Sequence, residues 1–195
     1  KNDWALNKLV LFYQDNGDWL NSKKYLELRL QYTGSQDSHK LSLYKIQEGR
    51  VLMMENNFKE ARDCFENALN IDNSCIIAHY FIGDSFSQES DLAYNQAQDY
   101  KNNSNQEQHD SLIVDAKDLL SKAIDNWVDY AKLKPDSSWM VIHLLRDALF
   151  ALDRYNEIEV ILKDILDKDS DNVDIIAALA DYYDHMGDSK SALKI

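Results

Sequence analysis

Turn-forming residues are scarce in this sequence: its 195 residues include only 5 glycines and 1 proline. An all-β sandwich or barrel needs a turn about every 8–12 residues, and such turns depend largely on glycine and proline. Long helices with short connections need far fewer of these residues. The composition therefore argues against an all-β protein and favours an all-α one.

Long apolar runs are also missing. No stretch of about 18 uncharged apolar residues occurs, so we expect no segment of this sequence to insert directly into a membrane. No secretory signal opens the sequence, which predicts a cytoplasmic location. Because the sequence starts at Lys1 rather than at a methionine and ends at Ile195 directly after a helix-like segment, we expect it to be a piece of a longer protein.

Basic residues are fewer than acidic ones in this sequence. The chain has 21 Lys and Arg residues against 34 Asp and Glu residues, which gives a formal net charge of −13. Binding to DNA or RNA requires a basic surface, and no block of lysine and arginine occurs, so we expect no nucleic-acid partner. The charge also disfavours an anionic membrane surface. It permits a basic protein partner, although most acidic domains are acidic only for solubility.

The residues that catalysis or metal binding would need are scattered. Cys64 and Cys75 fit neither a disulfide framework nor a C-x-x-C metal site, and we interpret them as reduced, packed thiols. Asp181 and His185 have i, i+4 spacing, but a solvated helix face explains this pair better than a metal site. No phosphate-binding loop or nucleophile motif is present. We therefore predict no catalytic residue, no metal, no cofactor and no enzyme activity.

A two-helix pattern recurs along the chain. In its clearest copy a small residue, Gly49, is followed three positions later by Leu52, and the second helix places Ala61, Phe65 and Ala68 at matching intervals. This pattern resembles the tetratricopeptide repeat (TPR), a helix–turn–helix unit of about 34 residues. The small residues let two helices approach closely, and the large residues fill the space beside them.

Other copies of the pattern support the same interpretation. Ala180 and Tyr183 repeat the small–large step, and Gly187 then ends the helix in the manner of a left-handed C-terminal cap. Ala123 and Trp127 repeat the step of the second helix. The predicted fold is therefore all-α, a right-handed superhelical solenoid of about five TPR-like helical hairpins in a single domain over 1–195. The predicted units are 3–36, 42–75, 76–136, 137–172 and a truncated repeat at 173–195.

One unit is interrupted by an insertion of about 29 residues near 89–115, judged against the repeat period. Its middle is polar and rich in Asn and Gln, whereas its ends carry apolar residues. We expect either two overlong helices joined by a mobile tip or a disordered loop. Insertions in solenoids often lie on the binding face, but a tolerated surface insertion is the alternative.

The first helix of each unit lines the concave side of such a solenoid. This placement predicts a partner-binding groove with aromatic, apolar and acidic residues, while an ordinary solvated groove is the alternative. The groove lacks the Lys and Arg cluster that would hold a C-terminal carboxylate, so a basic or amphipathic protein segment is the expected partner. The candidate residues are Gln14, Arg50, Met53, Tyr80, Asp84, His143, Asp147, Phe150 and Asp181.

The order of the units resembles one bacterial family, the lipopolysaccharide assembly protein B (LapB/YciM) family. Tyr13 and Gln14 are similar to the end of a family helix, and Trp19 is similar to the tryptophan that opens the next one. The IDNS turn and the Ile82–Gly83 step are also similar. The resemblance covers nearly the whole chain, but it uses generic repeat positions, and the insertion departs from the compact repeats of the family.

The resemblance implies a scaffold at the cytoplasmic face of the inner membrane. Such a scaffold would regulate lipopolysaccharide (lipid A) synthesis by bringing a biosynthetic enzyme to a membrane protease. It also implies an N-terminal membrane helix and a four-cysteine metal domain, neither of which occurs in these 195 residues. The alternatives are a generic bacterial TPR scaffold or adaptor, a regulator that binds a small ligand or metal in the groove, and the regulatory domain of a larger enzyme.

Overall fold

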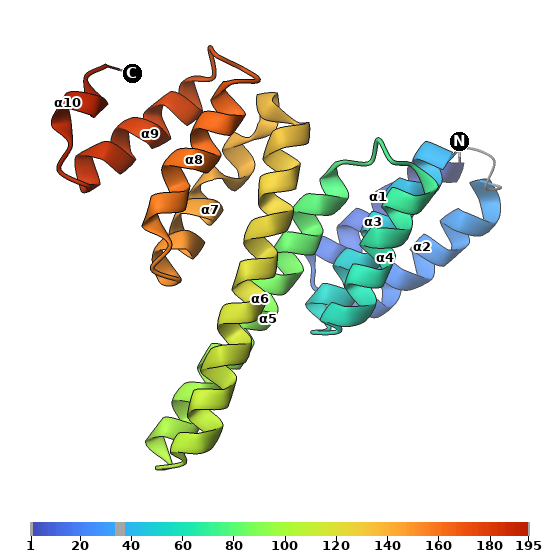
Figure 1. The fold of residues 1–195 in the computed structure, drawn as a ribbon. Coiled ribbons are helices and arrows are strands. Elements are labelled where there is room, and N and C mark those ends of the chain that lie inside the picture. Colours follow the sequence, from blue (N-terminus) through green and yellow to red (C-terminus); the bar gives the residue numbers. More distant parts are fainter. Residues whose placement is uncertain (1, 34–37, 195) are drawn as a thin grey trace. The chain divides into compact units, whose positions relative to one another are not determined.

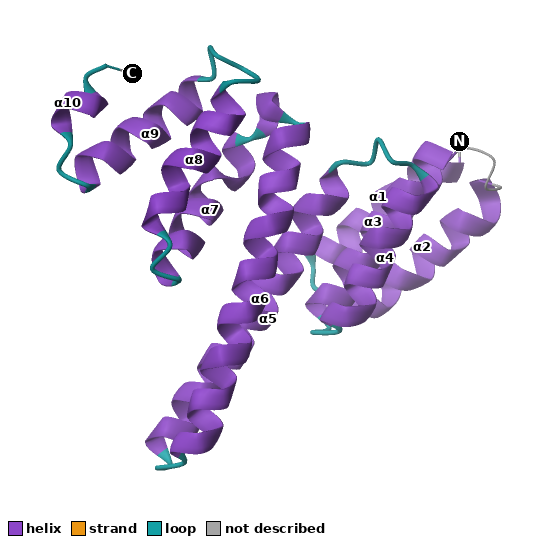
Figure 2. Cartoon of the chain, in the orientation of Figure 1, coloured by secondary structure: helices purple, strands orange, loops and turns teal. Residues whose placement is uncertain are grey.

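The computed structural model describes residues 2–33 and 38–194, and every regular element among them is helical (Figures 1 and 2). This confirms the all-α prediction. One short 3-10 helix, η1 (Pro135–Ser137), precedes α7. The α-helices are α1 (Asn2–Asp15), α2 (Trp19–Thr33), α3 (Ser38–Met54), α4 (Phe58–Ile71), α5 (Ile77–Asn102), α6 (Gln106–Leu133), α7 (Trp139–Ala151), α8 (Tyr155–Leu166), α9 (Val173–His185) and α10 (Ser189–Ala192).

The chain forms two compact units, residues 1–89 and 90–195. In the first unit α1 packs on α2, α2 on α3, and α3 on α4. In the second unit α7 packs on α8, α8 on α9, and α9 on α10. Neighbouring helices in sequence are thus neighbours in space, as expected of helical hairpins. A single domain over 1–195 and the boundaries of the repeat units stay predictions.

The same turn joins the two helices of five hairpins. Each turn contains one residue in the left-handed region, with φ between 57° and 73°, namely Gly17, Asn56, Ser104, Asp153 or Gly187. The second helix begins two residues later in every case. The residue between donates its N–H to a carbonyl five positions back, as Asp188 does to Tyr183 at 2.8 Å. This confirms the predicted left-handed cap at Gly187 and shows that the hairpins share one backbone pattern.

The core of the first unit depends on a close approach of α3 and α4. A Cβ atom added to Gly49 would lie 2.4 Å from Cε1 of Phe65, so only glycine fits here without a shift of the ring. Phe65, Ala61 and Ala68 are fully buried in this hydrophobic core, and Phe65 stacks on Phe81 of α5 at 5.5 Å between ring centroids. The structure thus confirms the packing role that the repeat pattern predicts for Gly49.

A polar cluster on α1, α2 and α3 was not evident in the sequence. Arg29 of α2 donates to the Asp3 carboxylate at 2.6 Å and to the Gln47 side chain at 3.1 Å, and its guanidinium lies 4.4 Å from the ring centroid of Tyr44. The Arg29 hydrogen bond, together with that from the Tyr44 hydroxyl, lowers the pKa of the Asp3 carboxyl. The cluster links the three helices at their polar edge.

The insertion near 89–115 is helical in the structure. It prolongs α5 and α6, which are joined by Asn103–Asn105, and the parts of both helices that belong to the second unit run side by side (Figure 1). In the second unit the Ser90 hydroxyl of α5 donates to the Ala116 carbonyl of α6 at 2.7 Å, which fixes the two helices at that level. Of the two predicted alternatives the chain therefore has the long helices rather than the loop.

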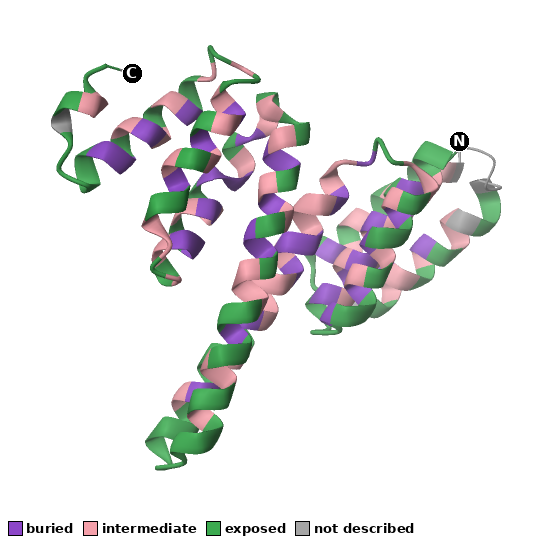
Figure 3. Ribbon diagram, viewed as in Figure 1, coloured by how far each residue is buried: buried purple, intermediate pink, exposed green. Residues whose placement is uncertain are grey.

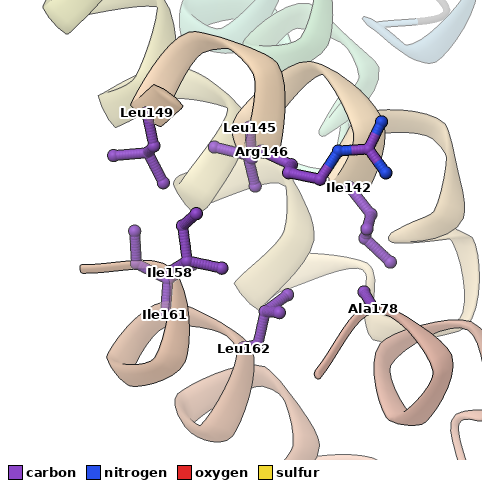
Figure 4. A pocket seen from close by; sticks show the side chains of 8 residues that line it. All are labelled: Ile142, Leu145, Arg146, Leu149, Ile158, Ile161, Leu162 and Ala178. Atoms are coloured by element: carbon purple, nitrogen blue, oxygen red, sulfur yellow. The ribbon is translucent and has the colours of Figure 1, made fainter. Parts of the chain in front are cut away.

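The second unit has its own buried residues (Figure 3), and most of them are apolar. Ala123, Trp127 and Tyr130 of α6 are buried, as the repeat pattern predicts. Side chains of α7, α8 and α9, all apolar except Arg146, also line a cavity of about 10 Å³. Figure 4 shows these side chains. A cavity of this size holds at most one water molecule, so it belongs to the core rather than to a ligand site. Its lining includes Ile142, Leu145, Leu149, Ile158, Ile161, Leu162 and Ala178.

Candidate functional site: a groove on helices α7 and α9

Two adjoining clefts lie along α7 and α9 in the second unit, and we call them together the α7–α9 groove. The larger has a volume of about 620 Å³ and the smaller about 330 Å³, and they share Arg146 and Asp181. The first is lined by Trp139, Ile142, His143, Arg146, Asp174, Ala177, Ala178 and Asp181. The second is lined by Arg146, Phe150, Asp181, Tyr182 and His185.

Helical periodicity explains why these side chains meet. Four lining residues of α7 follow one another at steps of four, three and four, which places them on one face of the helix. They are Trp139, His143, Arg146 and Phe150. On α9 the same steps connect Asp174, Ala178, Asp181 and His185. Both faces contribute to both clefts, so the groove follows the two helices along their length.

The start of α9 is tied to the segment before α7. Asn172 caps α9 by accepting a hydrogen bond from the Ile175 N–H at 3.2 Å. The Asn172 amide group donates to the Pro135 carbonyl at 2.8 Å. This pair of bonds fixes the two helix starts relative to each other. It thereby positions Trp139 and Asp174, which lie in the first turns of α7 and α9.

The groove combines open carboxylates with aromatic surface. Asp174 and Asp181 are exposed, and neither forms an ion pair within the described residues. At one end of the groove lies Trp139, which is 57% exposed. At the other end the Phe150 ring meets the His185 ring edge-on at 4.8 Å. This chemistry suits a cationic and partly apolar ligand.

Arg146 is the arginine of the groove. Its Nε donates to the Asp147 carboxylate at 3.0 Å, so part of its charge is already compensated by the neighbouring residue on the same helix. Figure 4 shows its guanidinium extending away from the apolar cluster around Leu149 and Ile158. The local balance of the groove therefore remains acidic, with two exposed carboxylates and one compensated arginine.

Three of the predicted site residues line this groove, namely His143, Phe150 and Asp181. Asp147 lies beside it and contacts it through Arg146. Sequence reasoning missed Trp139 and Asp174. Their spacing would have revealed them, since each lies on the same helix face as a predicted groove residue.

In the first unit the structure brings Arg50, Tyr80 and Asp84 near one another. The Arg50 guanidinium of α3 lies 5.4 Å from the ring centroid of Phe81 on α5, and the Tyr80 ring meets Phe81 edge-on at 5.1 Å. Asp84 accepts a hydrogen bond from the Gln88 amide at 3.2 Å. Burial raises the pKa of the Asp84 carboxyl, and Gln88 and Arg50 offset only part of that effect.

Met53 and Gln14 lie elsewhere. Met53 is only 3% exposed and belongs to the hydrophobic core of α3 and α4. Gln14 is 9% exposed, and neither its amide nitrogen nor its amide oxygen has a partner within the described residues. The face of α3 that the repeat register assigns to the groove is thus largely interior. Met53 and Gln14 are interior residues rather than groove residues.

The substitution Asp84→Asn is expected to raise the melting temperature at neutral pH. A carboxyl whose pKa is raised by folding destabilises the folded state when it is ionised. That cost is present above the raised pKa and disappears as the pH falls toward the ordinary value near 4. Thermal unfolding at several pH values checks this, because the advantage of the variant must shrink with falling pH. An equal advantage at neutral pH and at a pH of about 3 would contradict it.

Within residues 2–33 and 38–194 no group of three His, Cys, Asp or Glu side chains is arranged to hold a metal ion. In the same part of the chain no helix combines the length and the apolar character that crossing a bilayer requires.

The similarity of this chain to known proteins is a similarity of fold. No family model matches the sequence, and no curated protein matches it. Two solved structures of nearly identical TPR-like repeats from a putative kinesin light chain of Podosopora anserina are similar. One is 16% identical with a TM-score of 0.51, covering 100% of this chain and 92% of its own. The other, a variant of the same repeats, is 17% identical with a TM-score of 0.50, covering 97% and 89%.

A tetratricopeptide repeat protein from Parabacteroides merdae is also similar, at 15% identity and a TM-score of 0.40, covering 99% of this chain and 77% of its own. The two kinesin light chain structures and the recurring hairpin show that the chain has a TPR-like fold, as the repeat pattern predicts. The more specific resemblance to the lipopolysaccharide assembly protein B family stays a prediction.

Proposed function

We propose that the chain is a non-enzymatic protein–protein interaction module that binds a basic segment of a partner protein in the α7–α9 groove. The observation that carries this proposal is the charge of the groove. Asp174 and Asp181 are exposed beside aromatic side chains and have no ion-pair partner within the described residues. Two solvated carboxylates attract cations from solution and also orient them on arrival.

The TPR-like fold supports this function, because stacked helical hairpins present extended surfaces that suit peptide segments. The groove also contains aromatic side chains at both ends, and such side chains supply much of the binding free energy in protein interfaces. Basic residues of the partner would pair with the carboxylates, and apolar residues would cover Trp139 and Phe150.

Selection from a random peptide library displayed on phage tests the proposal. Wild-type protein is expected to enrich peptides rich in Lys and Arg. The variant Asp181→Lys should bind those peptides about tenfold more weakly or worse, because it replaces an attraction by a repulsion. Binding should also weaken with added salt, as expected of partly exposed charges.

The matched control is Asp115→Lys, which makes the same change of charge on an exposed position of α6 outside the groove. It should retain the binding of the selected peptides to within a few-fold. Equal losses in both variants would show that net charge rather than the groove attracts the peptides. Enrichment of acidic peptides would contradict the proposal directly.

The role in lipopolysaccharide synthesis that the family resemblance implies stays a narrower hypothesis. Under it, the partner proteins would be a membrane protease and an enzyme of lipid A synthesis. Crosslinking of the full-length protein in its own cells, followed by mass spectrometry, tests it. Recovery of both proteins from wild type, and their loss from Asp181→Lys, is the expected result, whereas an unrelated complex would leave only the general scaffold function.

A further inference from the structure

The two ends of the α7–α9 groove differ in chemistry. At one end the exposed Trp139 and the exposed Asp174, in the first turns of α7 and α9, both line the larger cleft. An aromatic face and a carboxylate together bind a Lys or Arg head group, through cation–π attraction and a charge-assisted hydrogen bond. We call Trp139 and Asp174 the cation subsite.

The other end is aromatic. Phe150 of α7 contacts His185 of α9 edge-on and also meets Tyr155 at 5.2 Å between ring centroids, while Tyr182 is only 7% exposed. The smaller cleft opens onto Phe150, Tyr182 and His185. This surface suits an apolar or aromatic side chain. We call Phe150, Tyr182 and His185 the aromatic subsite.

The middle of the groove is polar. Arg146 and Asp181 line both clefts, whereas the small side chains of Ala177 and Ala178 line only the larger one. A helix laid with its apolar face in the groove would bury the Arg146 and Asp181 charges against apolar side chains, which is costly. An extended segment instead offers backbone N–H and C=O groups at this level, and these can bond to both charged side chains.

The separation of the subsites follows from α7. Trp139 and Phe150 are eleven residues apart in this helix, which corresponds to a rise of about 16 Å. An extended chain covers about 3.3 Å per residue, so about five residues cover the same distance. The groove should therefore select ligands by the spacing between two of their side chains.

We infer that the groove recognises an extended basic segment in which a Lys or Arg lies about five residues from an apolar or aromatic residue. This inference rests on the proposed function and adds to it the chemistry and the spacing of the ligand. Trp139 and Asp174 bind the cation, Phe150 and its neighbours bind the apolar side chain, and the middle of the groove binds the backbone.

The test uses synthetic peptides of about ten residues, made of Ser and Thr with one Arg and one Phe at spacings of about three, five and eight. Each is titrated into the ¹⁵N-labelled protein, and nuclear magnetic resonance shifts give the dissociation constant even for weak binding. The indole N–H signal of Trp139, assigned by its loss in Trp139→Phe, reports directly on the cation subsite. The spacing of about five is expected to bind about tenfold more tightly than the others.

Variants separate the subsites. The double variant Trp139→Ala, Asp174→Ala should remove most of the preference for Arg over Ser in the peptide, and Trp139→Ala alone should weaken it, while both keep the preference for Phe. Phe150→Ala should do the reverse, and Phe150→Leu provides a second variant should the alanine variant lose stability, because it keeps an apolar side chain. Melting temperatures confirm that each variant is folded.

The possible outcomes separate this inference from the proposed function. Binding that depends on Asp181 but not on spacing, or that is strongest for an amphipathic helical peptide, overturns the inference and leaves the proposed function standing. Shifts confined to residues outside the groove, or no binding of any basic peptide, overturn both.

Discussion

Replacing Trp127 by alanine is expected to lower the free energy of unfolding by about 3–5 kcal/mol. Trp127 lies in α6 and is only 1% exposed, so the change removes one of the largest fully buried side chains of the chain. Tryptophan buries roughly 150–250 Å² of surface, and the surrounding helices relax only partly into the space it leaves. Urea unfolding followed by helical circular dichroism measures the loss.

The indole nitrogen of Trp127 limits how much this side chain contributes to the stability of the folded state. Its indole N–H is buried and has no hydrogen-bond partner within the described residues. An unsatisfied donor costs free energy in the folded state. The variant Trp127→Phe removes the donor while keeping an aromatic ring, and is therefore expected to lose less than half as much stability as Trp127→Ala.

The matched control for Trp127→Ala is Trp139→Ala, the same substitution in the same unit at a position that is 57% exposed. It should change stability by less than about 0.5 kcal/mol. Hydrogen exchange locates the effect, because Trp127→Ala should reduce protection in residues 90–195 first. A loss from Trp127→Ala as small as that from Trp139→Ala would show that Trp127 is not a core residue and that the repeat register of α6 is wrong.

The repeat pattern predicted the fold because a few positions, where helices pack closely, accept only side chains of a particular size. Gly49 and Phe65 occur at the interval that close helix packing requires, and the structure confirms this contact. Trp127 follows Ala123 at the interval by which Phe65 follows Ala61, and it is likewise buried. Such positions are predictable because each tolerates only a narrow range of side-chain volumes.

The insertion was less predictable. Its Asn- and Gln-rich middle has neither apolar periodicity nor glycine and proline to mark a break, so sequence alone left a loop and a helical extension open. The structure has helices on both sides of Asn103–Asn105, with Ser104 at φ 60° in the turn. Local turn geometry, rather than hydrophobic pattern, ends these helices.

The candidate site residues of the second unit lie along one groove, whereas two of those in the first unit are interior. The helical register explains this difference. Consecutive helical residues differ by about 100° around the axis, so a small error in register turns a groove residue into a core residue. This is the case for Met53, which is 3% exposed in α3. Trp139 opens α7 and lies four residues before His143, so the same periodicity places it on the groove face although it was not among the predicted residues.

The substitution Gly49→Ala has two opposed effects on stability: it raises helix propensity, and it introduces a steric overlap with Phe65. Alanine is the better helix former, and propensity alone would favour it by about 1 kcal/mol in the interior of a helix. The added Cβ, however, would lie 2.4 Å from Phe65 Cε1 and 2.7 Å from Cζ, in a ring that is fully buried. Overpacking of this kind costs about 1–3 kcal/mol. We expect steric repulsion to win and Gly49→Ala to be destabilising.

A double-mutant cycle with Phe65→Leu isolates the contact. Leucine lacks the ring edge that the new Cβ would meet, so Gly49→Ala should cost about 1 kcal/mol less in that background, or become stabilising. Gly17→Ala is the control, since Gly17 has φ +70° and no atom within 4 Å of an added Cβ. Its cost comes from backbone strain alone, and Phe65→Leu should not change it. A Gly49→Ala variant more stable than wild type would mean that α3 and α4 do not approach as closely as the structure has them.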